Sequence, residues 1–272
     1  MKVSKTPKNR WQINKEHWNA VATVKNLKGN TERVNWEKER QLYRSADVTQ
    51  GYSFLEPLAG KVVVDLGGGV GLSAHDFLDR GARVLIVDVS IARCKIAQKH
   101  FVAQGFQGEI QCIVAAAQAL PLAAESVDRL WTKSVLIHTP LKRTAKELAR
   151  VLKPGGKAWF VEPMRRNPFV NLYRMLQAPQ IWQQITTYFS PREFRLLRRA
   201  FRQKGFSTST SVYYFFGFFA FVFSFLISSP TLFRLAEKFF GTADSILFSL
   251  LPGIKRFAWF GALAVTKNNA AK

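Results

Sequence analysis

Cysteine is scarce in this sequence of 272 residues, which contains only Cys94 and Cys112. Two cysteines are too few for a disulfide framework, and neither belongs to a CxxC pair of the kind that binds zinc. Both lie in segments whose apolar pattern predicts burial, so we expect unreactive thiols in a reducing compartment. The basic residues 1–18 are not followed by an apolar segment, which predicts a cytoplasmic protein without a cleaved secretory signal.

Acidic residues are also few. The chain has 18 Asp and Glu against 40 Lys and Arg, which gives a formal net charge of +22. Such an excess predicts attraction to a polyanion, either nucleic acid or an anionic lipid surface. The alternative is the ordinary solvated surface of a protein from a basic proteome. Hydrophobic residues make up 47% and charged residues 21%, a balance that excludes a mostly disordered chain and allows one large α/β domain.

Short apolar runs alternate with amphipathic stretches between residues 61 and 162. The runs predict strands at 62–64, 84–87, 110–114, 127–132 and 157–162, and the stretches predict helices at 71–80, 91–104 and 140–151. Strands and helices that alternate at this spacing specify a parallel sheet covered on both faces. Residues 1–50 are basic and contain Trp11, Trp18 and Trp36. We expect them to form a helical lead-in that covers one end of the domain.

The segment from Asp65 to Gly71 (DLGGGVG) follows the first predicted strand and opens the first predicted helix. Glycine at Gly67, Gly69 and Gly71 allows a tight turn and lets a ligand approach the backbone, because no Cβ is in the way. A nicotinamide-binding loop would need its third glycine at the position of Leu72. The spacing here instead favours a methionine moiety and an adenosine without a pyrophosphate. The alternative is that the glycines only allow a tight turn between strand and helix, without a ligand.

Asp88 ends the second predicted strand. A carboxylate at this position can accept both hydroxyl protons of a ribose. The alternative role for Asp88 is to cap the helix that begins near Ser90, and the two roles are compatible.

Five segments occur in a characteristic order: VVVDLGGGVG, LIVDVS, AQALPLAAESVDRL, SVLIHTP and ELARVLKPGGKAWFVEP. Together they resemble the class I S-adenosylmethionine-dependent methyltransferases, above all the small-molecule branch with the ubiquinone and menaquinone methyltransferases. The resemblance implies an α/β, Rossmann-like seven-stranded sheet, mostly parallel with an antiparallel last strand, and S-adenosyl-L-methionine as the cofactor. On this basis residues 206–214 and 257–266 are predicted as strands six and seven.

The predicted domain organisation follows from this assignment. Residues 1–50 form the lead-in, 51–214 the cofactor-binding core, 215–256 an apolar helical insertion, and 257–272 the last strand and tail.

The resemblance also implies which residues hold the cofactor. The amino-acid end would lie against Asp65, Gly67, Gly69 and Gly71, and the ribose against Asp88 and Val89. The family usually has an acidic residue at the position of Ala116, where it reaches the adenine amino group. This sequence has alanine there, so we expect Gln118 to substitute, or the backbone of Ala116 and Ala117 to contact the ring.

Two residues beyond the predicted strands are the candidates for chemistry, and no metal ligands are predicted. His138 follows the fourth strand, at the edge where parallel sheets bind ligands. Histidine titrates near neutrality, so His138 is the predicted base for an acceptor hydroxyl; the alternative is that it fixes the loop before Pro140. Glu162 ends the fifth strand and is predicted to bind a polar group of the acceptor, unless it caps a helix or pairs with Arg165 or Arg166.

Residues 212–227 (VYYFFGFFAFVFSFLI) carry no charge, and residues 165–204 upstream hold nine Lys and Arg and one acid, Glu193. The apolar run is shorter than the about 20 residues that a membrane span needs. With the basic residues, it favours a helix that lies on an anionic membrane surface, at the inner face. The alternative is an aromatic core element that covers a pocket or a dimer interface.

These features predict methyl transfer to an apolar or lipid-linked small molecule, on oxygen or carbon, with oxygen favoured by His138. The formal net charge of +22 also favours the hypothesis of a nucleic-acid methyltransferase. Against it, no RNA-binding module precedes the predicted core, and TKSV stands where an Asp/Asn-Pro-Pro-Tyr/Phe motif would follow the fourth strand. A non-catalytic, membrane-associated binding protein is the third alternative.

Overall fold

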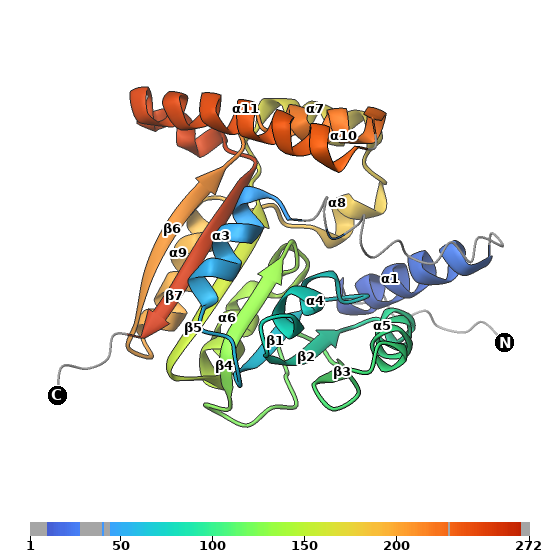
Figure 1. The fold of residues 1–272 in the computed structure, drawn as a ribbon. Coiled ribbons are helices and arrows are strands. Elements are labelled where there is room, and N and C mark those ends of the chain that lie inside the picture. Colours follow the sequence, from blue (N-terminus) through green and yellow to red (C-terminus); the bar gives the residue numbers. More distant parts are fainter. Residues whose placement is uncertain (1–9, 28–39, 41–43, 228, 268–272) are drawn as a thin grey trace, which may run out of the picture.

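A computed structural model describes residues 10–27, 40, 44–227 and 229–267. Its centre is a seven-stranded sheet in the order β3-β2-β1-β4-β5-β7-β6 (Figure 1). The strands are β1 (Val62–Leu66), β2 (Arg83–Asp88), β3 (Ile110–Val114), β4 (Val127–Lys133), β5 (Leu152–Pro163), β6 (Phe206–Tyr213) and β7 (Phe260–Lys267). β7 runs antiparallel to β5 and β6, and the remaining neighbours pair in parallel. The predicted Rossmann-like fold with an antiparallel last strand is confirmed.

Helices cover both faces of the sheet. One face packs against α3 (Ala46–Leu55), α4 (Leu72–Leu78) and α5 (Ile91–Ala103), and the other against α6 (Leu141–Val151) and α9 (Pro191–Arg202). Successive side chains of a strand point to opposite faces. Trp159 and Val161 of β5 therefore join the core under α3, whereas Ala158 and Phe160 join the core under α6 and α9.

The remaining helices lie beyond the carboxyl ends of the parallel strands. α1 (Arg10–Leu27) packs on α5 and on the short α8 (Ile181–Ile185). α7 (Pro168–Gln177), α10 (Phe218–Ile227) and α11 (Pro230–Leu250) form a layer across the top of the view in Figure 1. Rings of Phe169 and Tyr173 in α7 contact rings of α10. In the described part of the chain, no helix is both long and apolar enough to cross a membrane.

The structure divides the apolar run 212–227, for which the sequence predicts a helix that overlaps the predicted strand 206–214. The first two residues of the run finish β6, Tyr214 takes a positive φ of 63°, and α10 begins only at Phe218. The break is stabilised by Asp244 of α11, whose carboxylate accepts hydrogen bonds from the N–H groups of residues 215–217 at 2.8–3.0 Å. β7 likewise begins at Phe260 rather than at residue 257, because the 3-10 helix η2 (Pro252–Phe257) precedes it.

Gly51 is the point at which α3 meets the sheet most closely. A Cβ there would lie 2.4 Å from Trp159 Cδ1 and 2.5 Å from Trp131 Cζ3. Gly51→Ala should therefore lower the free energy of unfolding by about 1–3 kcal/mol, because the added methyl forces α3 away from the sheet. Gly241→Ala in α11 is the matched control, since a Cβ there has no neighbour within 4 Å. It should raise stability by about 0.5–1 kcal/mol. Urea denaturation measures both, and equal losses would contradict the close packing at Gly51.

Candidate functional site

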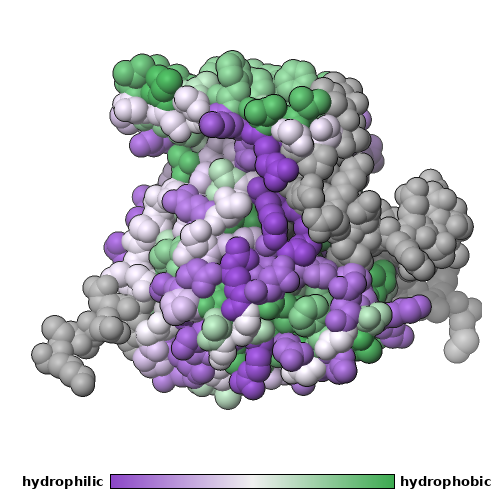
Figure 2. All heavy atoms as spheres, viewed as in Figure 1, coloured by the Kyte–Doolittle hydropathy of each residue, from purple (hydrophilic) through white to green (hydrophobic). Residues whose placement is uncertain are grey.

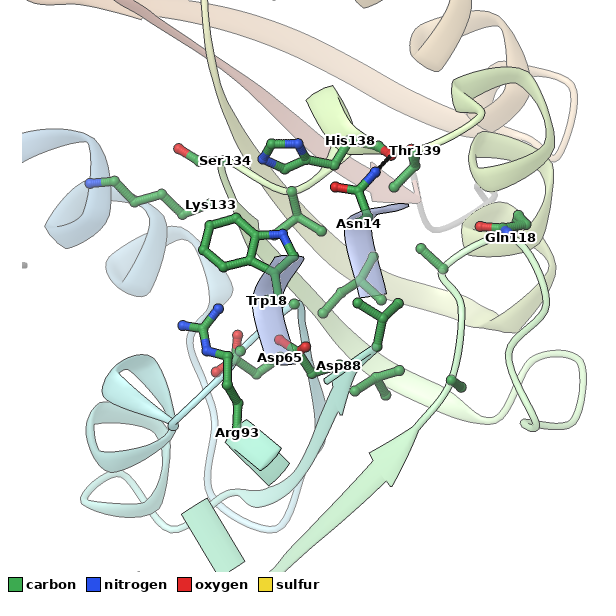
Figure 3. A pocket seen from close by; sticks show the side chains of 18 of the residues that line it. Asn14, Trp18, Asp65, Asp88, Arg93, Gln118, Lys133, Ser134, His138 and Thr139 are labelled. Carbon is green, nitrogen blue, oxygen red and sulfur yellow. Dashed lines mark hydrogen bonds between the residues drawn. The ribbon is translucent and has the colours of Figure 1, made fainter. Parts of the chain in front are cut away.

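The carboxyl ends of β1, β2 and β4 border a cavity of about 260 Å³. Its walls come from segments 65–73, 87–93, 115–118 and 133–140 at this edge of the sheet, and from α1 (Figure 3). Parallel α/β sheets bind ligands at this position. The predicted cofactor residues that line the cavity are Asp65, Gly67, Asp88, Val89, Ala117 and Gln118, and those that do not are Gly69, Gly71 and Ala116.

The turn after β1 requires glycine because of its backbone and its neighbours. Gly67 has a φ of 67°, and a Cβ there would lie 2.4 Å from Val135 Cγ2. At Gly68 a Cβ would lie 2.4 Å from Asp65 Oδ2. The turn therefore brings bare backbone to the cavity wall, next to the carboxylate of Asp65.

Gly69 and Gly71 do not line the cavity, and their contacts instead stabilise the turn and the start of α4. Gly69 donates its N–H to Asp88 Oδ2 at 3.0 Å. Gly71, with a φ of 92°, begins α4, and a Cβ there would lie 2.6 Å from Phe101 Cε2. The described contacts of these two glycines are thus with the protein itself, and their predicted contact with a cofactor stays a prediction.

Asp65 is a buried carboxylate at the start of the turn, with 2% of its surface exposed. Its Oδ2 has no hydrogen-bond partner among the described residues. Burial raises the pKa of Asp65 to about 7; the negative charge of Asp88 adds to the rise, and the Arg93 guanidinium opposes it. A cationic group placed in the cavity would favour the ionised form of this carboxyl.

Asp88 is the second buried carboxylate of the cavity. Its Oδ2 accepts the N–H of Gly69, and its Oδ1 accepts the N–H of Ser90 at 2.8 Å. Burial raises the pKa of Asp88, whereas Arg93 and the backbone donors lower it. The cap of α5 is Ser90, whose Oγ accepts from the Arg93 N–H at 3.2 Å. Since each carboxylate oxygen has a second lone pair, Asp88 keeps capacity for ligand hydroxyls.

The wall beyond β3 differs slightly from the prediction. Ala116 pairs with Ala119 in an isolated antiparallel bridge, in which the Ala119 N–H donates to the Ala116 carbonyl at 3.0 Å. Ala116 does not line the cavity, whereas Ala115, Ala117 and Gln118 do. The predicted contact of the Ala116 backbone with an adenine ring stays a prediction.

His138 ends the short 3-10 helix η1 (Leu136–His138) and lines the cavity beside Trp18, with ring centroids 5.8 Å apart (Figure 3). Its Nδ1 lies 3.2 Å from the carbonyl oxygen of Ile185. A carbonyl can only accept, so the neutral ring carries its proton on Nδ1 and its basic lone pair on Nε2. His138 therefore fixes the loop to α8, and its ring also borders the cavity.

Glu162 lies beneath this loop, has no exposed surface and is absent from the cavity wall. Its carboxylate accepts hydrogen bonds from Thr132 Oγ1 at 3.1 Å and from the N–H groups of residues 135–137 at 2.9–3.2 Å. Burial raises the pKa of Glu162 to about 7, and these donors lower it. The described contacts of Glu162 position the loop that carries His138, and its predicted contact with an acceptor stays a prediction. The alternative partner Arg165 pairs with Glu193 at 3.2 Å.

Comparison with known proteins shows what this site is similar to. Residues 64–160, which hold the turn, Asp88 and His138, match the sequence model of a methyltransferase domain. The chain is 36% identical over 110 residues to "Methyltransferase GfsG" of Streptomyces halstedii, with 40% of each chain covered. It is 31% identical over 127 residues to a ubiquinone biosynthesis O-methyltransferase of Stutzerimonas stutzeri, with 46% of this chain and 54% of that protein covered.

The chain thus spans about half the length, or less, of these curated relatives. A crystal structure of geranyl diphosphate C-methyltransferase from Streptomyces coelicolor shares the fold, with a TM-score of 0.56 and 15% identity. That match covers 81% of this chain and 80% of the other. The predicted resemblance to class I methyltransferases is confirmed.

Helix α1 adds a wall to the cavity that the sequence did not locate. It contributes Trp11, Asn14 and Trp18 to the cavity. Asn14 Nδ2 donates to the His138 carbonyl at 3.3 Å, and the Arg93 guanidinium lies 5.2 Å from the Trp18 ring centroid. The tryptophans of the lead-in were the available signal, but only the position of α1 shows which of its residues face the cavity.

Lys133 connects the cavity to α11 through a chain of polar groups. It lines the cavity, and its Nζ lies 2.9 Å from Asp47 Oδ2. The Tyr214 hydroxyl lies 2.8 Å from Asp47 Oδ1 and 2.9 Å from Glu237 Oε1 of α11. Burial raises the pKa of both Tyr214 and Glu237. This largely buried chain of polar groups holds α11 in a fixed position relative to the cavity.

The buried carboxyls of Asp65 and Glu162 predict a pH dependence of stability. Asp65 and Glu162 each have a pKa of about 7 in the folded protein, above the value near ~4 of an unfolded chain. The folded state keeps protons that the unfolded state has lost. Their stabilising contribution is therefore complete below about pH 4 and is lost as the pH rises through about 7.

Asp65→Asn should flatten the fall of the urea midpoint between about pH 4 and about pH 8, because the titrating group is gone. Asp79→Asn, at a half-exposed carboxylate outside the cavity, is the matched control and should keep the wild-type slope. Identical slopes for Asp65→Asn and the wild type would contradict the raised pKa.

Proposed function

We propose that this chain transfers a methyl group from S-adenosyl-L-methionine to an apolar or lipid-linked small molecule. The observation that carries the proposal is the cavity in which the glycine turn meets two buried carboxylates, Asp65 and Asp88. The relatives support it, because one is named for ubiquinone biosynthesis and a structural neighbour for geranyl diphosphate. The structure of that neighbour contains S-adenosyl-L-homocysteine.

The residues of the cavity fit this cofactor. The Oδ2 of Asp65, buried without a partner among the described residues, suits the ammonium group at the amino-acid end. Asp88 has lone pairs for the ribose hydroxyls, and its position at the end of β2 is the one that nucleotide-binding sheets use. Val89, Ala117 and Gln118 line the wall on the adenine side. The side chain of Gln118 has both a hydrogen-bond donor and an acceptor for the edge of an adenine ring. In this role it would replace the acidic residue that the family usually has.

When bound, the cofactor supplies a methyl group that is already activated on a sulfonium. The protein therefore acts mainly by aligning the acceptor and excluding water. Trp11 and Trp18 of α1 cover the cavity on one side and reduce the access of water. Glu162 contributes indirectly, because its hydrogen bonds hold the loop on which His138 stands.

The lining of the cavity favours an apolar acceptor with an acidic hydroxyl. Apolar side chains contribute to this lining beyond the glycine turn, among them Leu72 and Val135. His138 at this wall can remove the proton of an acceptor hydroxyl, which favours oxygen over carbon as the methylated atom.

Cells with and without the gene, grown with an isotopically labelled methyl donor, identify the acceptor. We expect a labelled, lipid-soluble small molecule in cells with the gene and no such labelled molecule in cells without it. Label in nucleic acid would instead favour a nucleic-acid methyltransferase, and no labelled product together with no cofactor binding would favour a non-catalytic protein.

Asp88→Ala should raise the Kd for S-adenosyl-L-methionine at least tenfold, which corresponds to about 1.4 kcal/mol. The reason is the loss of the only carboxylate placed at the end of β2. Titration calorimetry measures the change, with Asp79→Ala, outside the cavity, as the matched control. An unchanged Kd in Asp88→Ala would remove the ribose role.

His138→Ala should lower kcat by about 10²–10⁴-fold if it takes the hydroxyl proton, while the cofactor Kd changes little. Once the acceptor is known, steady-state kinetics with that acceptor measure the effect. Cofactor binding in the same variant controls for damage to the loop. A wild-type kcat in His138→Ala would reject the base role and favour a carbon acceptor.

A further inference from the structure

Exposed apolar side chains are concentrated on one layer of the molecule. Among the described residues, eleven of the fifteen exposed large hydrophobic side chains belong to α7, α10, α11 and the residue that follows α11. They are Leu172, Tyr173, Met175, Leu176, Phe223, Leu232, Leu235, Phe239, Ile246, Leu250 and Leu251. Figure 2 shows apolar residues gathered along the top of the molecule, where Figure 1 places these helices. We call these eleven residues the apolar face.

The part of the apolar face on α11 is a regular stripe. Its exposed residues Leu232, Leu235, Phe239, Ile246 and Leu250 are spaced by three, four, seven and four positions. At 3.6 residues per turn, they all point within a sector of about 60°. Leu250 of the stripe is 73% exposed, and Met175 of α7, which also belongs to the apolar face, is 82% exposed. No described residue of this chain packs over these side chains.

The other side of α11 is anchored, so the stripe is presented outward. Phe233 and Phe248 are buried, and Asp244 binds the backbone N–H groups that precede α10. Glu237 accepts the Ala46 N–H at 2.7 Å and contacts Tyr214. Turning the stripe inward would expose this buried side and break these bonds.

An apolar cavity of about 400 Å³ opens between α10 and α11. Four residues of the apolar face line it, namely Phe223, Leu232, Leu235 and Phe239, and among the described residues of its wall only Ser229 carries a hydroxyl. A cavity with this lining suits a hydrocarbon chain, because a polar ligand would find almost no hydrogen-bond partners there.

The charges around the apolar face are positive. Residues 165–256 contain thirteen Lys and Arg and three acids. Each acid is engaged within the protein: Glu193 by Ser190 and Arg165, Glu237 by Ala46 and Tyr214, and Asp244 by the start of α10. Exposed Arg234 and Lys238 lie on α11 beside the stripe, and exposed Lys255 and Arg256 follow its end.

We propose that the apolar face docks on the surface of an anionic lipid bilayer, with the stripe of α11 in the interfacial region and the flanking basic residues against the head groups. An apolar face with cationic flanks matches a bilayer of this kind in both properties. A symmetric dimer built on the same face would instead bring the basic residues around it near those of the second copy, while the three acids of residues 165–256 are already engaged, so like charges would repel. Nucleic acid would leave the apolar stripe without a partner.

Sedimentation with sucrose-loaded vesicles tests this docking on the whole chain. The vesicles are phosphatidylcholine alone and phosphatidylcholine with about 30% phosphatidylglycerol, an anionic surface. The wild type should bind the anionic vesicles and lose most of that binding in high salt. The triple variant Leu235→Ser/Phe239→Ser/Ile246→Ser should bind at least about tenfold more weakly, because it removes buried apolar area. The control Ile91→Ser/Val102→Ser loses comparably exposed apolar residues on α5 and should bind like the wild type.

A second arm separates charge from apolar contact. Arg234→Gln/Lys238→Gln should weaken binding to the anionic vesicles by about fivefold per charge removed, without changing binding to the neutral ones. Circular dichroism, urea midpoints and cofactor affinity verify that each variant is folded, and Leu235→Ser alone serves if the triple variant is not.

The proposal is overturned if the wild type ignores anionic vesicles or if the triple variant and the α5 control bind equally. It is also overturned if the triple variant instead disperses a dimer seen in sedimentation. Methyl transfer to a soluble acceptor does not depend on this face, so either proposal can fail while the other stands.

Discussion

Two carboxylates, Asp65 and Asp88, are buried side by side at the carboxyl edge of the sheet, and the site depends on how their charge is balanced. Burial raises the pKa of each, and each disfavours ionisation of its neighbour. The Arg93 guanidinium and the backbone N–H groups of Gly69 and Ser90 offset part of that cost. A cationic ligand would relieve the remaining cost of ionising the two carboxyls. For this reason a buried acid pair indicates a binding site rather than simple packing.

The surroundings of this pair are built to hold it in place. Glycine is needed at Gly67 because a side chain there would collide with Val135, and Val135 lies on the loop that Glu162 holds through three backbone N–H groups. The turn and the loop with His138 are therefore fixed against each other. On the far side, the polar chain from Lys133 to Glu237 fixes α11, so the apolar face keeps one orientation relative to the cavity.

The sequence predicted the parts of this site that depend on local pattern. Strand–turn–helix periodicity located the turn at 65–71 and Asp88, because the carboxyl ends of neighbouring parallel strands must meet. The parallel sheet followed from the same alternation, and the antiparallel last strand from the family resemblance. Sequence position put Glu162 at the edge of the sheet but could not show that its side chain lies beneath a loop. Nor could periodicity show the bridge between Ala116 and Ala119.

Long-range packing was beyond the sequence. Nothing in residues 10–27 shows that Asn14 and Trp18 reach the loop after β4, since that contact joins segments more than a hundred residues apart. Trp36, which the sequence grouped with them, lies outside the described residues. Strand six was predicted within one residue of β6, but the helix predicted over 212–227 begins only at Phe218. The break at Tyr214 depends on Asp244, a residue of the next helix, which the local pattern does not show. The exposed stripe of α11 likewise appears only once its anchored side is known.

Calorimetry of S-adenosyl-L-methionine binding near pH 7, in buffers of different ionisation enthalpy, tests the role of the carboxylate pair most directly. If the cofactor's cationic end lies against Asp65, binding should release a fraction of a proton, because the ligand pulls that carboxyl from partly protonated to ionised. The release should vanish in Asp65→Asn and in the wild type well above pH 7. Cofactor binding without proton release in the wild type, or with equal release in Asp65→Asn, would contradict this placement, and no binding would contradict the site itself.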